Sequence, residues 1–151
     1  MLAALILVGG AGLAGCATTV ALIPSPGAND PACAEVMVRL PSVVAGQERR
    51  FTDAQSTAAW GDPASVILTC GVEPIGPTTL PCQTVDDVDW VIDDADAPRY
   101  RVTTFNREPA VEVFLDNDAV SSADVLDSLT QRVAQLPAND SACTSLDDTA
   151  D

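Results

Sequence analysis

Four cysteines constrain the fold of this chain more than any other feature, because they join distant parts of the sequence if they are oxidised. They are Cys33, Cys70, Cys82 and Cys143. Four cysteines allow three pairings. We expect the disulfide Cys70–Cys82 to close the loop between these two residues, and a second disulfide, Cys33–Cys143, to tie the first helix to the tail. The alternative pairs Cys33 with Cys70 and Cys82 with Cys143.

A fifth cysteine, Cys16, follows a segment with the properties of an export signal. Residues 1–23 contain no charged side chain, and they begin with a short apolar run followed by a glycine cluster. The sequence Leu13-Ala14-Gly15-Cys16 resembles the bacterial lipobox, which implies cleavage before Cys16 and attachment of diacylglycerol to its thiol. We therefore expect a signal peptide at residues 1–15 and a lipid anchor on the extracytoplasmic face of the cell membrane.

The same segment has a second interpretation. Signal peptides begin with Lys or Arg, and this one does not. The uncharged run up to Ile23 is also long enough to span a bilayer as an uncleaved helix. The glycine cluster and the position of Cys16 favour the lipobox, and we expect the lipidated cysteine and a linker to occupy residues 16–29. Both interpretations place the following domain outside the cytoplasm, where disulfides form.

The charge of the chain disfavours several classes of function. Seven Lys and Arg residues face 22 Asp and Glu residues, which gives a net charge of -15. Such a surface repels phosphate backbones, so we expect no nucleic-acid partner. The chain has neither His nor Lys, so a conventional catalytic triad and a Ser–Lys dyad are excluded. We expect no cofactor, and we favour a binding protein over an enzyme.

Hydrophobic patterns predict a disulfide-stabilised α+β domain over residues 30–137. Consecutive apolar residues at 66–68 indicate a central strand, because both of its faces require burial. Alternation predicts a half-buried strand at residues 85–94. Two further strands, at residues 100–105 and 110–115, flank a loop and predict a hairpin.

Two helices are predicted on either side of these strands. Asp30 is a capping residue at the start of a helix over residues 30–41, and Ser121 opens an amphipathic helix that ends before Pro137. The order of elements predicts an antiparallel sheet of about four strands with two helices packed on one face. An acidic tail at residues 138–151 follows.

Several sequence phrases resemble an actinobacterial family of exported and lipid-anchored proteins, known as domain of unknown function 3515. The resemblance extends over roughly residues 33–136, about the size of one domain. It implies an envelope location and a disulfide-bearing domain, but it implies no reaction and no catalytic residue. The phrases are Trp60-Gly61-Asp62-Pro63, Cys70-Gly71-Val72, Val88-Asp89-Trp90 and Arg107-Glu108-Pro109-Ala110-Val111-Glu112-Val113.

An acidic cluster at residues 86–96 raises the question of a Ca²⁺ site. Its spacing differs from that of an EF-hand loop, and no glycine stands where such a loop turns. We interpret these residues, including Asp89, as the solvated face of a strand and a turn. We therefore expect no metal site.

Trp60, Asp62 and Arg107 are predicted to form one corner of the fold, either structural or ligand-binding. The turn that carries Asp62 and the loop that carries Arg107 both lie at strand ends, and the chain has few cations. We expect the two side chains to form an ion pair, while Arg107 could instead bind a ligand anion. Trp60, beside the turn, could form an exposed binding platform, whereas alternation places Trp90 in the core.

These patterns together predict a cell-envelope lipoprotein that acts as a binding or interaction module. Its partners would be the membrane, through the anchor at Cys16, and an envelope protein or ligand of unknown identity. The alternative is a hydrolase of envelope material that uses a carboxylate pair such as Asp62 and Glu112.

Overall fold

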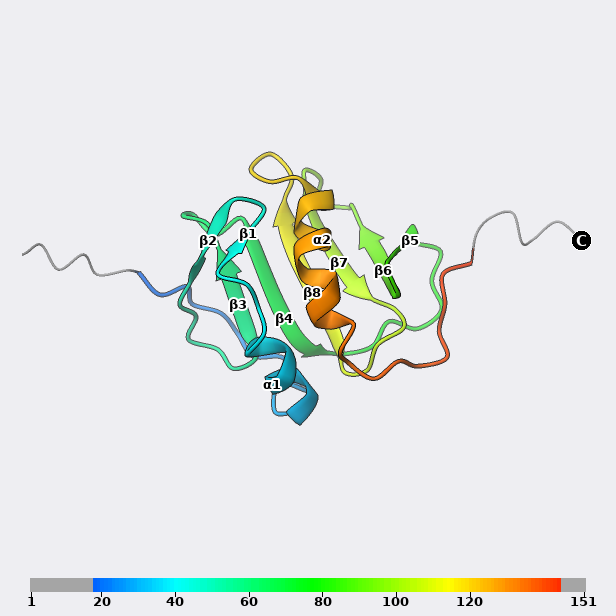
Figure 1. The fold of residues 1–151 in the computed structure, drawn as a ribbon. Coiled ribbons are helices and arrows are strands. Elements are labelled where there is room, and N and C mark those ends of the chain that lie inside the picture. The colour runs from blue at the N-terminus through cyan, green and yellow to red at the C-terminus, as the bar shows by residue number, and fades with distance from the viewer. Residues whose placement is uncertain (1–17, 145–151) are drawn as a thin grey trace, which may run out of the picture.

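The computed structural model describes residues 18–144, which form one eight-stranded antiparallel sheet and two helices (Figure 1). The expectation of about four strands is therefore wrong. The elements are α1 (Pro31–Met37), β1 (Val43–Val44), β2 (Gln47–Arg50), β3 (Thr57–Trp60), β4 (Val66–Val72), β5 (Cys82–Val85), β6 (Val88–Asp93), β7 (Arg99–Thr104), β8 (Ala110–Asp116) and α2 (Ser122–Val133).

The strands that the sequence patterns missed are β1, β2, β3 and β5. They contain two to four residues each, and the side chains of β2 and β5 are exposed or half-buried. Strands this short show too little alternation to predict a pleated face. The predicted strand at residues 85–94 corresponds to β6, and its first residues instead belong to β5 and to the turn between the two strands.

The strand order is β1-β2-β3-β4-β8-β7-β6-β5, so two meanders meet where β4 pairs with β8. The predicted central strand is β4, and the predicted hairpin is formed by β7 and β8. After β4 the chain must reach β5 at the far edge, on the other side of three strands. Residues 73–81, which we call the crossing segment, connect β4 to β5. Two of its side chains, Ile75 and Leu80, line a hollow together with residues of β6, β7 and β8.

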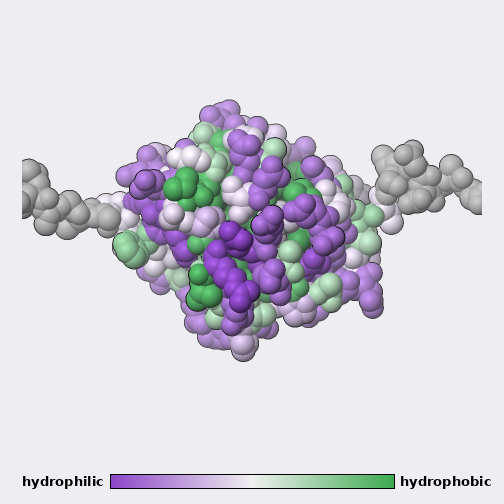
Figure 2. Space-filling model, viewed as in Figure 1, coloured by the Kyte–Doolittle hydropathy of each residue, from purple (hydrophilic) through white to green (hydrophobic). Residues whose placement is uncertain are grey.

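The helix α2 packs against one face of the sheet and contacts both β1 and β5, near the two edges (Figure 1). Val125, Leu129 and Val133 recur along one side of the helix and are fully buried. The side chain of Ser121 accepts a hydrogen bond from the Asp124 amide, which confirms the predicted cap. The outer side of the molecule over this helix is mostly hydrophilic (Figure 2).

The residues that precede α1 lie along the domain. Val20 forms a parallel bridge with Thr52. Further along, the Gly27 amide donates to the Gly71 carbonyl at 2.9 Å, and the Ser25 hydroxyl donates to the Cys70 carbonyl at 2.6 Å. The part of the expected linker that the structure describes is therefore fixed to the sheet.

Two disulfides are present, Cys33–Cys70 and Cys82–Cys143. The pairing that we favoured from the sequence is wrong, and the alternative pairing is confirmed. The reason is topological, because β8, β7 and β6 lie between β4 and β5. At the usual spacing of strands the two are separated by about 19 Å across the sheet, whereas the disulfides join Cα atoms 5.7 and 5.6 Å apart.

Cys16, the expected signal peptide and the last seven residues of the tail lie outside the described residues. Within the described part of the chain, no helix has both the length and the apolar character needed to cross a membrane.

Candidate functional site

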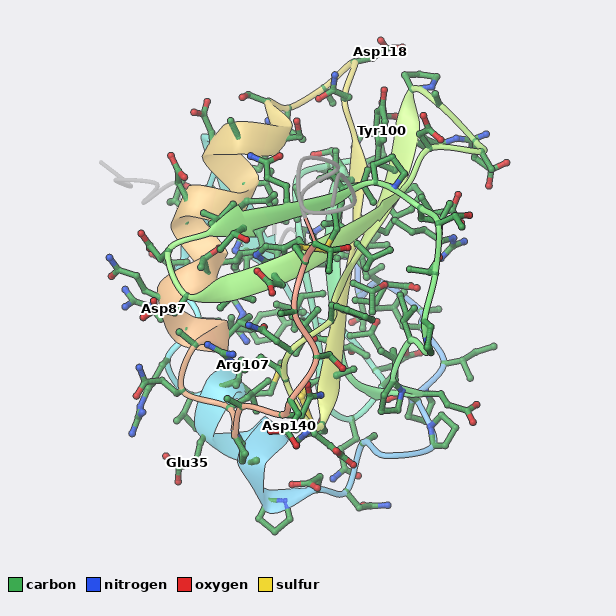
Figure 3. All side chains as sticks on the ribbon, turned by 90° about the vertical axis from the view of Figure 1, so that its right-hand side faces the viewer. Glu35, Asp87, Tyr100, Arg107, Asp118 and Asp140 are labelled. Carbon is green, nitrogen blue, oxygen red and sulfur yellow. A yellow bond between two sulfur atoms is a disulfide. The ribbon has the colours of Figure 1, made fainter. Side chains whose placement is uncertain are left out.

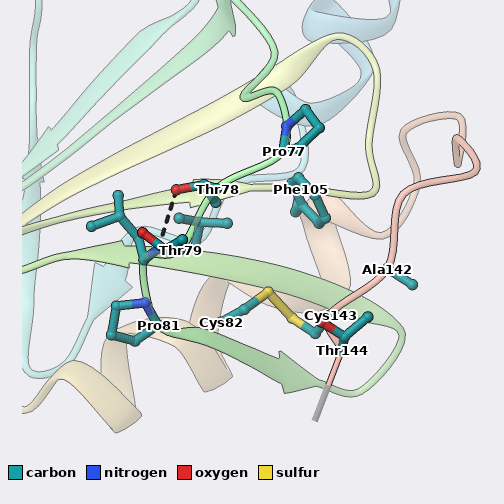
Figure 4. Close-up of a pocket in the computed structure, with 11 residues that line it drawn as sticks. Pro77, Thr78, Thr79, Pro81, Cys82, Phe105, Ala142, Cys143 and Thr144 are labelled. Atoms are coloured by element: carbon teal, nitrogen blue, oxygen red, sulfur yellow. Dashed lines mark hydrogen bonds between the residues drawn. A yellow bond between two sulfur atoms is a disulfide. The ribbon is translucent and has the colours of Figure 1, made fainter. Parts of the chain in front are cut away.

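A pocket of about 760 Å³ opens where the C-terminal segment, residues 134–144, meets β5 (Figure 4). Four parts of the chain form its walls: the crossing segment, the neighbouring strands β5 and β6, the residues around Cys143, and Phe105 after β7. The lining residues are Pro77, Thr78, Thr79, Leu80, Pro81, Cys82, Val91, Phe105, Ala142, Cys143 and Thr144.

The topology of the sheet brings these walls together. Cys82 lies opposite Val91 in the register of β5 and β6, so both line the same side of the pocket. The crossing segment enters β5 directly through Pro81. The third wall is held by the Cys82–Cys143 disulfide, which joins β5 to the segment that follows α2.

The buried carboxylate of Asp89 provides a second attachment for this wall. One of its oxygens accepts a hydrogen bond from the Cys143 amide at 2.8 Å, and the other accepts one from the Thr84 hydroxyl at 2.6 Å. Asp89 is only 6% exposed. The interpretation of this residue as part of a solvated strand face is therefore wrong, because the C-terminal segment covers it.

The Arg107 side chain lies beside the β5–β6 turn and is hydrogen-bonded to it (Figure 3). Its guanidinium donates to the Asp87 carbonyl at 2.7 Å and to the Asn106 carbonyl at 2.9 Å. The backbone of Arg107 also forms a bridge with Ala138 in the C-terminal segment. Arg107 is 5% exposed, and no carboxylate of the described residues forms an ion pair with it.

The side chains that line the pocket are uncharged. None of the lining residues carries an ionisable side chain, since both cysteines are in a disulfide. Three threonines supply hydroxyl groups, and that of Thr78 accepts a hydrogen bond from the Leu80 amide. A charged ligand would lose hydration here without finding a counter-charge, so the pocket suits an uncharged and largely apolar group.

A family model described as protein of unknown function (DUF3515) matches residues 2–141. The chain belongs to the DUF3515 family. The match begins in the apolar N-terminal segment and ends in the segment that borders the pocket. No curated protein and no solved structure gives a significant match.

In this DUF3515 chain the expected corner of Trp60, Asp62 and Arg107 is not formed. Asp62 pairs with Arg50 at 2.9 Å. Asp62 precedes β4 and Arg107 precedes β8, and because these strands are antiparallel the two residues lie at opposite ends of the sheet. Trp60 is fully buried, with its indole N–H donated to the Pro41 carbonyl, so it forms no exposed platform.

The candidate carboxylate pair of Asp62 and Glu112 is also separated in the DUF3515 fold. Glu112 lies opposite Thr69 within the sheet and binds Arg101 at 3.1 Å. Each carboxylate therefore has its own arginine, and their positions give no support to a glycosidase mechanism. Among the described residues, no group of three or more His, Cys, Asp and Glu side chains is arranged to hold a metal ion.

Proposed function

We propose that this chain is a cell-envelope lipoprotein, anchored through Cys16, whose domain binds an uncharged and largely apolar group of an envelope component. The observation that carries the proposal is the charge-free pocket at the β5 edge, in a chain whose net charge is -15. The crossing segment and the C-terminal segment supply most of the uncharged side chains that line this pocket.

Three features support an anchored protein. The family match includes the apolar N-terminal segment and the lipobox-like sequence that ends at Cys16. Two disulfides are typical of a protein that folds in an oxidising compartment. Thr18, only two residues after Cys16, is hydrogen-bonded to Arg50 of β2.

The described start of the N-terminal segment and strand β5, which borders the pocket, lie on opposite sides of the domain (Figure 1). The N-terminal segment runs beside β2 and β3, whereas the pocket lies beside β5 at the other edge. Six strand spacings separate β2 from β5, which corresponds to roughly 29 Å along the curved sheet. This separation would present the pocket to components beyond the lipid headgroups.

Site-specific photo-crosslinking in the native envelope tests the binding function. A photoreactive amino acid at Thr79, on the exposed rim of the pocket, is compared with the same amino acid at Gln131, on the exposed side of α2. We expect a discrete adduct from position 79 and none from position 131. Ala142→Trp, which places a large side chain in the pocket, should remove that adduct.

Equal labelling from both positions, or an adduct from position 79 that survives Ala142→Trp, would contradict a binding role for the pocket. Because residues 79, 131 and 142 are all exposed, these substitutions leave the buried core unchanged. Folding of each variant is checked by its thermal transition.

A further inference from the structure

Two of the three most exposed large hydrophobic side chains among the described residues lie on the segments around Thr18, and the third, Val38, lies at the end of α1. Ile23 is 87% exposed and Phe51 is 76% exposed. Single exposed apolar residues are common on proteins. These two are notable for their position, because Phe51 follows Arg50, which binds Thr18, and Ile23 lies five positions after Thr18 in the same N-terminal segment.

Hydrogen bonds place Ile23 and Phe51 on adjoining segments. The Val20 amide donates to the Phe51 carbonyl at 2.8 Å, and the Leu22 amide donates to the Asp53 carboxylate at the same distance. The N-terminal segment therefore follows the chain beyond β2, and Ile23 comes immediately after the second of these contacts.

Arginines accompany the exposed apolar side chains. Arg49 and Phe51 line one groove of about 420 Å³. Arg49 lies over the ring of Trp60, and no carboxylate of residues 18–144 forms an ion pair with it. We call Ile23, Arg49 and Phe51 the anchor-side patch.

Of the neighbouring acids Glu48, Asp53 and Asp62, only Asp62 forms an ion pair within the described residues. Asp53 accepts the hydrogen bond from the Leu22 amide, and Asp62 is paired with Arg50. Glu48 is exposed and stays a local source of negative charge. Two of the seven cations of the chain, Arg49 and Arg50, are therefore adjacent at the one end that an anchor would bring to the membrane.

The tether between the anchor and this surface is short. Arg50 donates to the carbonyl and to the hydroxyl of Thr18 at 2.6 and 2.7 Å, which fixes Thr18 against β2. Only Ala17 lies between Cys16 and Thr18, and two residue steps of fully extended chain span about 7 Å. Acyl chains on Cys16 would therefore enter the bilayer beside the anchor-side patch.

We propose that the anchor-side patch contacts the membrane itself, with Phe51 and Ile23 in the interfacial region and Arg49 on lipid phosphates. This inference rests on the proposed lipid anchor at Cys16. Aromatic side chains favour the headgroup level of a bilayer, and a second attachment strengthens the binding that an acyl chain provides. With the acyl chains at Cys16 and the anchor-side patch both held at the membrane, the domain has one orientation. In that orientation its pocket points away from the bilayer.

Fluorescence of the full mature lipoprotein in vesicles tests the contact. Phe51→Trp introduces a reporter into the patch, and the matched control Leu80→Trp introduces one at the exposed opposite end. The native Trp60 and Trp90 are fully buried, so the wild type gives the background. In vesicles of brominated phosphatidylcholine with phosphatidylglycerol, we expect F51W emission to shift to the blue and to lose most of its intensity, while L80W emission stays unchanged.

The charge of Arg49 is tested in the same reporter background. Arg49→Glu should reduce the quenching of F51W in vesicles that contain phosphatidylglycerol, because a carboxylate replaces the group that binds phosphate. Unchanged quenching would overturn the contact of Arg49 with lipid phosphates. Ile23→Trp provides an independent reporter of the same patch and should be quenched like F51W.

Intact mass of the same samples separates this inference from the proposed function. If Cys16 is acylated while F51W and I23W remain as unquenched as L80W, the membrane contact is refuted and the anchor stands. If Cys16 carries no acyl group, the proposed anchor is refuted, and the membrane contact that rests on it is refuted as well.

Discussion

Arg107 is a buried cation that bonds to carbonyl groups in a chain with 22 acidic residues. Its two acceptors belong to the β5–β6 turn and to the loop before β8, which are distant in sequence and adjacent in the fold. The guanidinium therefore works as a cross-link between backbone segments. This role explains why it is buried without a carboxylate from the described residues.

We predict that Arg107→Ala lowers the free energy of unfolding by about 2–4 kcal/mol, because it removes a buried side chain and the two hydrogen bonds that its charged guanidinium donates. The measurement is urea denaturation of the oxidised protein. Arg99→Ala is the matched control, since Arg99 is exposed and forms no ion pair within the described residues. A midpoint for the Arg107 variant equal to that of the Arg99 variant would show that the buried contacts contribute nothing.

For single residues, contacts between sequence neighbours could be predicted from the sequence, whereas contacts between residues far apart in the sequence could not. The caps at Asp30 and Ser121 were predicted correctly because a cap depends on its neighbours in sequence. The Asp62–Arg107 pair was not, because proximity depends on which ends of β4 and β8 meet. The cover of Asp89 by the Cys143 amide joins residues 54 positions apart, and no local pattern indicates it.

Among the elements, strands with long apolar runs were predictable and short edge strands were not. The run at residues 66–68 indicated β4, and alternation indicated β6. In β2 the sequence Gln47-Glu48-Arg49-Arg50 has no apolar side chain from which to infer a buried face. The sequence did contain one turn signal, Gly46. In the structure Ala45 and Gly46 form the two-residue turn between β1 and β2, and both adopt the positive φ that such a hairpin requires.

The attachment of the N-terminal segment depends on a close approach of two glycines. Gly71 has φ +83°, and a Cβ there would overlap the backbone of Gly27. Gly46 has a similar φ of +77° but has open space around it. The pair therefore separates backbone strain from steric exclusion.

We predict that Gly46→Ala costs only the left-handed conformation, about 1–2 kcal/mol. Gly71→Ala should cost more, because it also separates Gly27 from β4 and breaks the hydrogen bond between them. Urea denaturation measures the cost, and amide hydrogen exchange at Gly27 reports the bond. Equal costs for the two variants, with Gly27 still protected, would contradict the close approach.

At the scale of the whole molecule, one disulfide ties the N-terminal helix to the sheet and the other ties the C-terminal segment to it. Cys33–Cys70 fastens α1 to β4, and Cys82–Cys143 fastens the C-terminal segment to β5. The cysteines were visible in the sequence, but their pairing depended on strand order, which places β5 at the far edge from β1. The pocket depended on the same fact and had no signature in the sequence.

The account of the molecule depends on the proposed anchor at Cys16, because such an anchor would decide which end faces the membrane. Intact-mass spectrometry of protein extracted from the membranes of a host with the lipoprotein pathway tests it most directly. We predict a chain that begins at Cys16 and carries diacylglycerol, and Cys16→Ala should abolish the acylation. A wild-type chain that retains residues 1–15 and carries no acyl group would contradict the account.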